Sequence, residues 1–223
     1  MKQVVDWLNW YREMGVEMIG RPVGATHASP FLDVLPPLQG LDAVREELGD
    51  CQRCKLCSTR THIVFGSGNP KAKLMFIGEG PGADEDLQGV PFVGKAGELL
   101  TKMISAMKLS REEVYIANIV KCRPPNNRPP QEDEIAACQA FLLKQIEAIA
   151  PQVICALGSF AAQTLLKTQT RISDLRGKFH DLNGSVTTPA IKVMPTFHPA
   201  YLLRNPAEKK KVWEDLQKIM QVL

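Results

Sequence analysis

Residues 73–83 read KLMFIGEGPGA, and this stretch decides the fold. Its first half is a nearly unbroken run of large apolar side chains, which is typical of a strand that is covered on both faces of a parallel sheet. Its second half is rich in glycine and suits a tight turn from the strand into a helix. Similar apolar runs occur at residues 114–121, 153–158 and 191–197, so the sequence predicts four buried strands.

Segments with apolar residues at helical spacing separate these runs, at residues 96–107, 134–149 and 159–166. Strands that alternate with helices through right-handed crossovers predict an α/β fold, a three-layer α/β/α sandwich around a central four-stranded parallel sheet. In open parallel sheets, ligands bind beyond the carboxyl ends of the strands. The unusual residues of this chain lie at three of the four predicted strand ends, so we expect the functional site there.

The compact domain is expected to span residues 41–223, which is long enough to bury a core without help from a metal or a disulfide. Residues 1–40 lie outside it. Apolar residues at helical spacing predict an N-terminal helix over residues 2–19, and the Pro- and Gly-rich stretch that follows predicts a linker. The helix either docks on the domain or recruits a protein partner.

The net charge of the chain does not indicate whether the protein binds nucleic acid. The 27 Lys and Arg residues barely exceed the 24 Asp and Glu residues, so a DNA surface must come from local clustering of charge. The chain shows no secretory signal and no apolar run near the ~20 residues of a membrane span. We therefore expect a cytoplasmic protein without a membrane partner, in a compartment where clustered cysteines more often bind metal than form disulfides.

Four of the six cysteines suggest a metal centre. Cys51 and Cys54 form a C-x2-C pair, which is a chelating bite for one centre. Cys122 ends the second apolar run, and Cys138 lies on the inward face of a predicted helix. Two converging pairs of thiolates indicate either zinc or a four-iron cluster, and spacing alone does not separate these metals. Cys155, inside an apolar run, is interpreted as a small buried residue.

The glycine turn at residues 78–83, GEGPGA, fits the loose dinucleotide pattern G-x-G-x-x-G/A. The acidic run Asp84–Asp86 that follows would repel a pyrophosphate, which argues against a dinucleotide. Two interpretations remain. The turn is either a plain connection from strand to helix, or a tight turn at which Glu79 and backbone N–H groups face a ligand.

His198 follows the last apolar run and precedes Pro199, which suits the first turn of a helix. The positive end of that helix disfavours imidazolium. A neutral imidazole there can donate one hydrogen bond to an oxygen that gains negative charge, so we interpret His198 as functional rather than structural. The apolar pair Leu202-Leu203 beside Arg204 either wedges into a base stack or packs a short helix onto the sheet.

Four motifs occur in one order: GEGPG at residues 78–82, PFVGKAG at 91–97, NIVKCRPP at 118–125 and HPAYLLR at 198–204. With them, the chain from about Cys51 to its C-terminus resembles the family 4 uracil-DNA glycosylases of bacteria and archaea. The resemblance implies a DNA-repair hydrolase that cleaves the N-glycosidic bond of deoxyuridine, releases uracil and leaves an abasic site in base excision repair. We expect a monomer whose partner is uracil-containing DNA of the nucleoid.

The resemblance also implies a [4Fe–4S] cluster that is held by four cysteines, Cys51, Cys54, Cys122 and Cys138. Cys57 stands where the family pattern requires no ligand. The cluster is expected to be structural, because it would pin the segment before the first strand to the loop after the second.

Five residues are implied as the uracil-binding pocket: Gly80, Glu85, Phe92, Asn118 and His198. Phe92 would stack on the base, Asn118 would read its edge, and Glu85 would lie against its 5-position. Glu79 and His198 would be the catalytic residues. Glu79 would position water and stabilise a cationic sugar, and His198 would donate to the oxyanion.

DNA phosphates are expected to contact a set of basic side chains: Lys95, Lys121, Arg123, Arg128 and Arg204. The expected wedges are Leu202 and Leu203. Residues 122–130 hold no inserted basic loop of the kind with which one branch of the superfamily captures its product, so turnover is expected. Two rival functions remain open: a non-catalytic nucleic-acid binder with a redox-sensing cluster, and a nucleotide-binding enzyme that uses the glycine turn.

Overall fold

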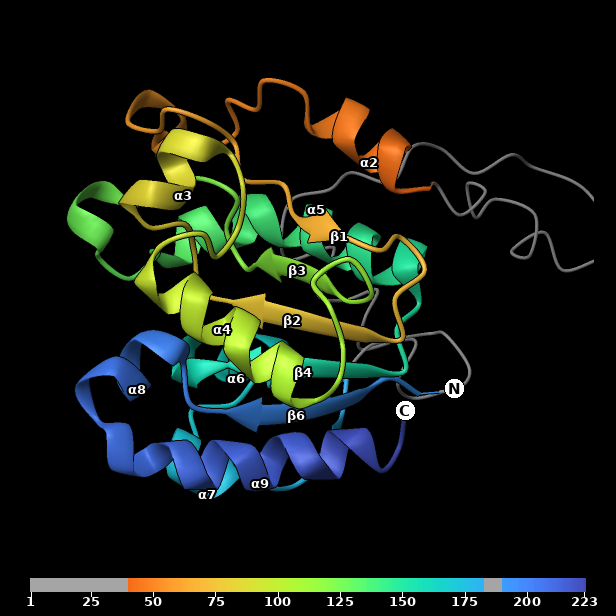
Figure 1. Ribbon diagram of the computed structural model, residues 1–223. Helices are drawn as coiled ribbons and strands as arrows, with labels where there is room; N and C mark the ends of the chain where they lie inside the picture. Colours follow the sequence, from red (N-terminus) through yellow and green to blue (C-terminus); the bar gives the residue numbers. More distant parts are fainter. Residues whose placement is uncertain (1–39, 183–189) are drawn as a thin grey trace, which may run out of the picture. The chain divides into compact units, whose positions relative to one another are not determined.

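The four apolar runs form the parallel centre of one sheet (Figure 1). This computed structural model describes residues 40–182 and 190–223. Within that part of the chain, the sheet has the strand order β1-β3-β2-β4-β6-β5. The parallel strands are β2 (Leu74–Gly78), β3 (Tyr115–Asn118), β4 (Val153–Leu157) and β6 (Lys192–Thr196). The prediction of a four-stranded parallel centre is therefore confirmed.

Two short edge strands make the sheet a mixed one. β1 (Ser67–Gly68) pairs antiparallel with β3, and β5 (His180–Asp181) pairs antiparallel with β6. Each has only two residues, which is too short to show the alternation by which a strand is found in a sequence. The sequence therefore predicts neither edge strand.

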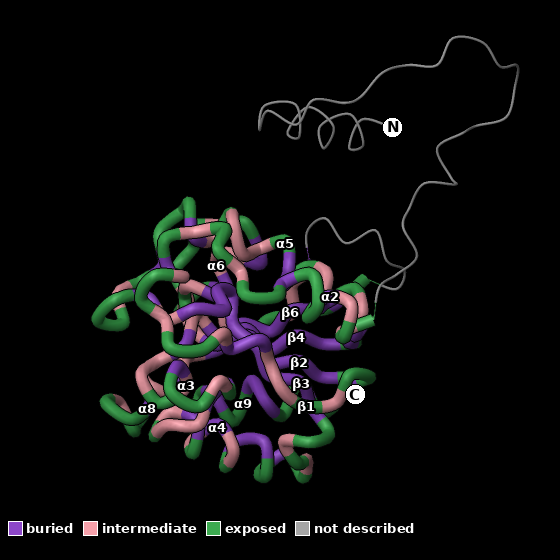
Figure 2. The backbone as a smooth tube through the Cα atoms, turned by 90° about the horizontal axis from the view of Figure 1, so that it is seen from above, coloured by how far each residue is buried: buried purple, intermediate pink, exposed green. Residues whose placement is uncertain are grey.

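Helices cover both faces of the sheet, which confirms the predicted sandwich (Figure 1). One face packs against α4 (Lys95–Ala106), α8 (Pro199–Arg204) and α9 (Lys209–Met220). The other face packs against α5 (Glu132–Ile149), α6 (Gly158–Leu166) and α7 (Ile172–Leu175). Successive strand residues such as Phe76 and Ile77 point to opposite faces, so each strand contributes to both cores. Figure 2 shows the buried strands in the middle of the domain.

A smaller apolar cluster joins α2 (Leu41–Leu48) to α5 through Val44, Leu48 and Phe141. The remaining short helices are α3 (Ala83–Gln88), η1 (Lys55–Ser58), η2 (Pro125–Asn127) and η3 (Pro206–Glu208). In residues 40–182 and 190–223 no helix combines the length and the apolarity needed to cross a membrane. The predicted helix at residues 2–19 and its linker lie outside the described residues, and the domain boundary near residue 41 stays a prediction.

Candidate active site

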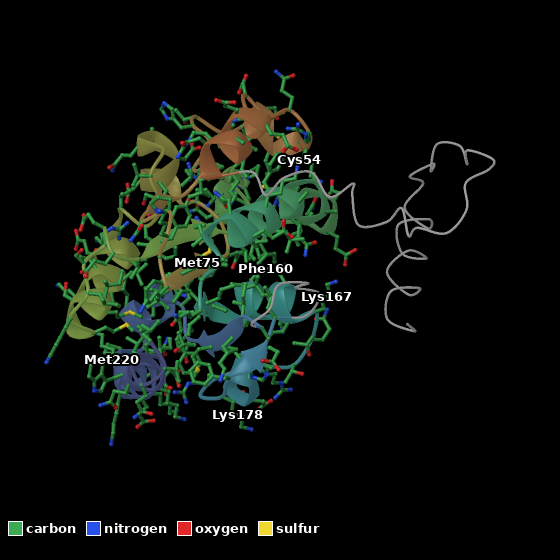
Figure 3. The ribbon with its side chains drawn as sticks, turned by 90° about the vertical axis from the view of Figure 1, so that its right-hand side faces the viewer. Cys54, Met75, Phe160, Lys167, Lys178 and Met220 are labelled. Atoms are coloured by element: carbon green, nitrogen blue, oxygen red, sulfur yellow. The ribbon has the colours of Figure 1, made fainter. Side chains whose placement is uncertain are left out.

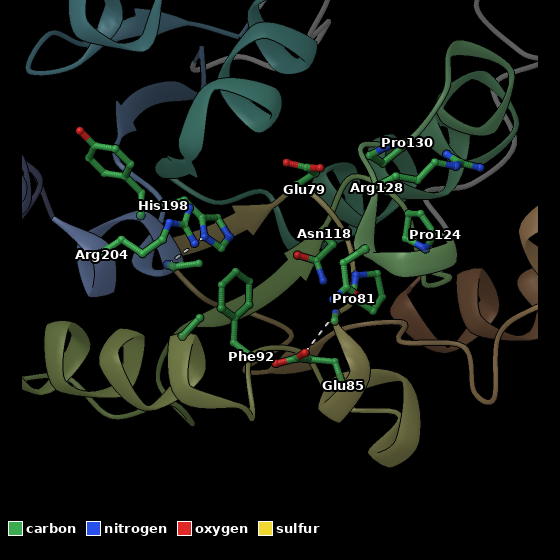
Figure 4. Close-up of a pocket in the computed structure, with 16 residues that line it drawn as sticks. Glu79, Pro81, Glu85, Phe92, Asn118, Pro124, Arg128, Pro130, His198 and Arg204 are labelled. Carbon is green, nitrogen blue, oxygen red and sulfur yellow. Dashed lines mark hydrogen bonds between the residues drawn. The ribbon is translucent and has the colours of Figure 1, made fainter.

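A cleft with a volume of about 470 Å³ opens beyond the carboxyl ends of β2, β3 and β6. Its wall includes Glu79, Phe92, Asn118 and His198, which the sequence placed at strand ends or in the motifs between them. Figure 4 shows the Phe92 ring between His198 and Glu85, close to Asn118. The fold therefore brings the predicted uracil-pocket residues to one place.

Asn118 is the last residue of β3 and is 1% exposed. Its side-chain oxygen Oδ1 has no hydrogen-bond partner within the described residues. The neighbouring residue on β2 is Gly78, and a Cβ there would lie 2.5 Å from this oxygen and 2.6 Å from the Phe92 ring. A buried acceptor without a partner costs free energy, so this oxygen is prepared for a donor on a ligand.

Phe92 presents its ring to the cleft from an unusual backbone conformation. Its φ is 54°, in the left-handed region that a bulky side chain rarely adopts. The loop returns so tightly onto α4 that a Cβ on Gly97 would lie 1.9 Å from the Phe92 carbonyl oxygen. The ring centroid lies 5.6 Å from that of His198, with an angle of 34° between the ring planes. The two rings form adjacent walls of the cleft.

His198 caps the N-terminus of α8. Its Nδ1 accepts a hydrogen bond from the Ala200 backbone N–H at 3.1 Å, which leaves the proton of the neutral ring on Nε2. Burial, helped by the charge of Arg204 and opposed by that of Glu85, lowers the pKa of His198 to about 4. The imidazole is therefore neutral near pH 7, in agreement with the expectation of a neutral donor.

Glu79 follows β2 and lines the same cleft. Burial raises the pKa of its carboxyl group above the ordinary value for glutamate. Its carboxylate makes no hydrogen bond or ion pair with another side chain in the part of the chain that the structure describes. Its acceptor oxygens are thus free for water or a ligand.

Glu85 lies on the cleft wall, but both carboxylate oxygens already accept backbone hydrogen bonds. Oε1 accepts from Val93 at 2.9 Å and from Gly94 at 3.1 Å, and Oε2 accepts from Gly82 at 3.0 Å. Glu85 therefore ties the glycine turn to the loop that carries Phe92. Its expected contact with the uracil 5-position stays a prediction. Gly80 also lines the cleft, as expected.

Four of the predicted phosphate contacts occur at or near the surface. Lys95 and Arg204 are exposed, and Arg204 borders the cleft. Arg123 donates from Nε to Asn127 at 2.8 Å. Arg128 borders the cleft too, and donates to both oxygens of buried Glu134 at 2.8 and 2.6 Å. The Arg128 pair fixes the loop before α5.

Two predicted DNA contacts are wrong. Lys121 is fully buried, and its Nζ donates to the Asn118 carbonyl at 2.8 Å and to Gln145 at 2.6 Å. Its side chain enters the core between β3 and α5, so it cannot reach a phosphate. Leu202 is 1% exposed and packs in the core beside α4, whereas Leu203 is 44% exposed. Only Leu203 is available as a wedge.

The cysteines of the expected cluster lie in segments that approach each other. The Lys121 backbone N–H donates to Cys138 Sγ at 3.3 Å, and Arg60 donates to Cys122 Sγ at 3.3 Å. Burial, opposed by the hydrogen bond and charge of Arg60 and helped by Cys138 and Cys54, raises the pKa of Cys122 to about 11. The pKa of Cys138 is raised by burial and then by Cys54 and Cys51. Cys54 thus lies near enough to act on Cys122 and Cys138, and Cys51 near enough to act on Cys138.

Cys57 affects only the pKa of Cys54 among these shifts, and Cys155 is fully buried as expected. Figure 3 shows Met75 inside the domain and Cys54 nearer its periphery, in the segment after α2. Across residues 40–182 and 190–223, no group of three or more His, Cys, Asp or Glu side chains converges closely enough to hold a metal ion. The N–H donors to Cys122 Sγ and Cys138 Sγ nevertheless suit thiolates that bind a metal centre, because such donors stabilise negative charge on sulfur.

Two polar residues that support the site, Gln145 and Arg60, are not predicted from the sequence. Gln145 is fully buried under Lys121 and also donates to the Phe65 carbonyl. Arg60 joins Cys122 to the Cys51 carbonyl. The sequence gives one signal for each: Gln145 is polar on an otherwise apolar helix face, and Arg60 is a charged residue next to the cysteine-rich segment. Neither signal identifies the partner of the side chain.

Known proteins resemble this chain over most of its length. The family model for the uracil DNA glycosylase superfamily matches residues 65–217. A type-4 uracil-DNA glycosylase of Saccharolobus solfataricus is 47% identical over 191 residues, which cover 83% of this chain and 88% of that protein. One of Thermotoga maritima is 46% identical over 181 residues, 80% of this chain and 92% of that protein. A type-5 uracil-DNA glycosylase of Pyrobaculum aerophilum is 30% identical over 151 residues, which cover 60% of this chain and 64% of that protein.

Proposed function

The chain belongs to the uracil DNA glycosylase superfamily, and from this we propose that it is an enzyme that removes uracil from DNA in base excision repair. It hydrolyses the N-glycosidic bond of deoxyuridine and leaves an abasic site. The type-4 relatives, which match most of the chain at 46–47% identity, support this activity. It is further proposed to act in the cytoplasm, on DNA of the nucleoid, as a monomer.

The single observation that carries the proposal is the buried, unpartnered oxygen of Asn118 in the cleft. A carboxamide offers one acceptor and two donors. Its oxygen suits the N3–H of uracil, and its NH₂ group suits O4. The Phe92 ring supplies a face on which the base stacks. The target base must leave the duplex stack to reach this cleft, because the stack hides the glycosidic bond.

The proposed hydrolysis uses two residues of the cleft wall, His198 for the leaving base and Glu79 for the sugar. When the bond from C1′ to N1 breaks, its electron pair leaves with uracil and negative charge develops on O2 and O4. The neutral His198 can donate its Nε2–H to O2. The sugar gains oxocarbenium character. Glu79 would stabilise that positive charge and orient the water that adds to C1′.

Cys51, Cys54, Cys122 and Cys138 are proposed to hold a [4Fe–4S] cluster. The electrostatic proximity of these four thiols and the N–H donors to Cys122 and Cys138 support it. When bound, the cluster would supply a covalent cross-link between the segment after α2, the loop after β3 and α5, and no chemical step.

The DNA surface is proposed to include Lys95, Arg123, Arg128 and Arg204 for phosphates and Leu203 as the wedge. Lys95, Leu203 and Arg204 are exposed, Arg128 and Arg204 border the cleft, and Arg123 is half-buried next to Pro124 of the cleft wall. Residues 1–40 are proposed to dock on the domain or to recruit a protein partner.

The function is tested with oligonucleotides that carry one uracil, thymine, hypoxanthine or abasic site. Wild-type protein should convert the uracil strand to an abasic, alkali-labile one. Asn118→Ala should lose most of this activity, whereas Asn69→Ala, on the turn after β1, should keep it. Binding without any strand lability would support the non-catalytic rival instead.

A further inference from the structure

A second cavity lies behind the Phe92 loop. Its volume is about 430 Å³, and its lining includes Ser67, Thr101, Arg111 and Phe92. Phe92 is the residue that this cavity shares with the uracil cleft. Any group that holds the loop from this side therefore acts on the wall of the active site without touching the substrate.

Arg111 holds the loop from inside this cavity. Its guanidinium donates to the Pro91 carbonyl at 2.8 Å and to the Thr101 hydroxyl at 3.2 Å. Thr101 connects Arg111 to α4, because its hydroxyl donates to the Gly97 carbonyl in that helix at 3.0 Å. The side chain is half-buried and forms no ion pair with a residue in the described part of the chain. Its donors are thus directed to the loop and to α4.

The other end of the loop is held by the opposite charge. Glu85 accepts from the backbone N–H groups of Val93 and Gly94, the two residues after Phe92. Arg111 donates to the carbonyl of Pro91, the residue before it. A cation and an anion therefore restrain the two peptide groups on either side of a residue with a φ of 54°. Such a strained conformation persists only where its surroundings over-determine it.

We propose that Arg111 is a positioning residue for uracil recognition, which fixes Phe92 in the conformation that presents its ring to the base. This inference rests on the proposed function. It assigns no contact between Arg111 and DNA, uracil or water. Without Arg111, Phe92 can relax toward an ordinary backbone conformation, and the stacking face leaves its position beside Asn118.

The test is a double-mutant cycle with Arg111→Met and Phe92→Ala, measured as single-turnover excision and as inhibition by free uracil. Arg111→Met alone should weaken uracil inhibition and slow excision about ten- to hundredfold, the range of a lost hydrogen bond from a charged donor. In the Phe92→Ala background it should add little, because the ring that it positions is gone. Arg111→Lys, which can still donate to Pro91, should recover part of the loss.

Arg171→Met, which removes an exposed arginine far along the chain, is the control for charge and should change neither readout. Melting temperatures of all variants separate global stability from positioning. Equal losses from Arg111→Met with and without the Phe92 ring would overturn the inference, and so would unchanged inhibition by uracil. If wild-type protein fails to excise uracil at all, the proposed function fails instead.

Discussion

Replacing His198 with alanine should slow uracil excision about 10²–10³-fold while DNA binding stays nearly normal, because it deletes one preorganised donor to the developing oxyanion. The Ala200 N–H holds Nδ1 at 3.1 Å, so Nε2–H is the available donor. Single-turnover rates and binding of a uracil oligonucleotide measure the two effects separately. His62→Ala, at an exposed histidine that contacts the Asp86 carbonyl, is the matched control.

The pH dependence has a definite sign. The folded pKa of His198, about 4, lies below its ordinary 6.5, so the neutral donor persists as pH rises above 7 and excision should not fall there for want of an acid. Between about pH 4 and pH 6.5, the folded and the ordinary pKa of His198, the unfolded chain binds more protons than the folded one. The contribution of neutral His198 to the free energy of unfolding is therefore fully present above pH 6.5. It is lost as pH falls through about 4, and the total loss is roughly 3 kcal/mol.

The measurement is excision between about pH 5 and pH 9, together with NMR of the His198 ring. His198→Ala should also make unfolding less sensitive to acid in the same window. The reasoning would be refuted if the rate fell about tenfold per pH unit above ~6.5 and His198 titrated there. His198 would then be a general acid, and its burial would not control its charge.

Three further predictions concern the catalytic carboxylate of Glu79, the cluster and the N-terminal segment. Glu79→Gln should slow excision more than it weakens binding, and because burial raises the Glu79 pKa, wild-type activity should fall on the acidic side at a higher pH than an ordinary glutamate would dictate; equal losses in binding and rate would contradict this. Cys122→Ser should lose both the absorbance near ~400 nm and stability, whereas Cys57→Ser keeps both; stoichiometric zinc without iron in anaerobically prepared protein would exclude the cluster. A chain that starts near residue 41 should retain most excision, and an inactive but soluble and cluster-loaded truncation would count against this.

The parallel strands could be predicted because burial on both faces leaves a nearly continuous apolar run. Their carboxyl ends then located the cleft, since parallel strands end at the same edge of the sheet. Glu79 and His198 were predicted in this way, whereas the role of Asn118 followed from the resemblance to the family 4 uracil-DNA glycosylases. The edge strands β1 and β5 could not be found, because a pairing of two residues is set by its neighbours and not by its own pattern.

The restraints on Phe92 could not be predicted either. Arg111 donates to Pro91, 20 residues away, and to Thr101, 10 residues away. Glu85 reaches across eight residues to Val93. None of these pairs lies within one helix or strand, so only the path of the loop brings the partners together. The resemblance implies Phe92 as the stacking ring, but it does not identify the groups that hold this residue.

Lys121 shows how an error in burial changes a functional prediction. Lysine is almost never fully buried, so a lysine at the edge of a predicted site is taken as a phosphate ligand. Here its ammonium group is enclosed and holds the main chain of Asn118. Of the five predicted phosphate contacts, four remain, and each neutralised phosphate contributes roughly −0.9 to the slope of log K against log salt for duplex DNA.

That slope should therefore be no steeper than about −4. Arg204→Met, at an exposed residue beside the cleft, should lower its magnitude by about 1. Lys121→Met should leave it unchanged while it lowers stability, because Gln145 and the Asn118 carbonyl lose their buried partner. Binding titrations across a range of salt concentrations decide between the two. A reduced slope for Lys121→Met would mean that the lysine leaves the core when DNA binds.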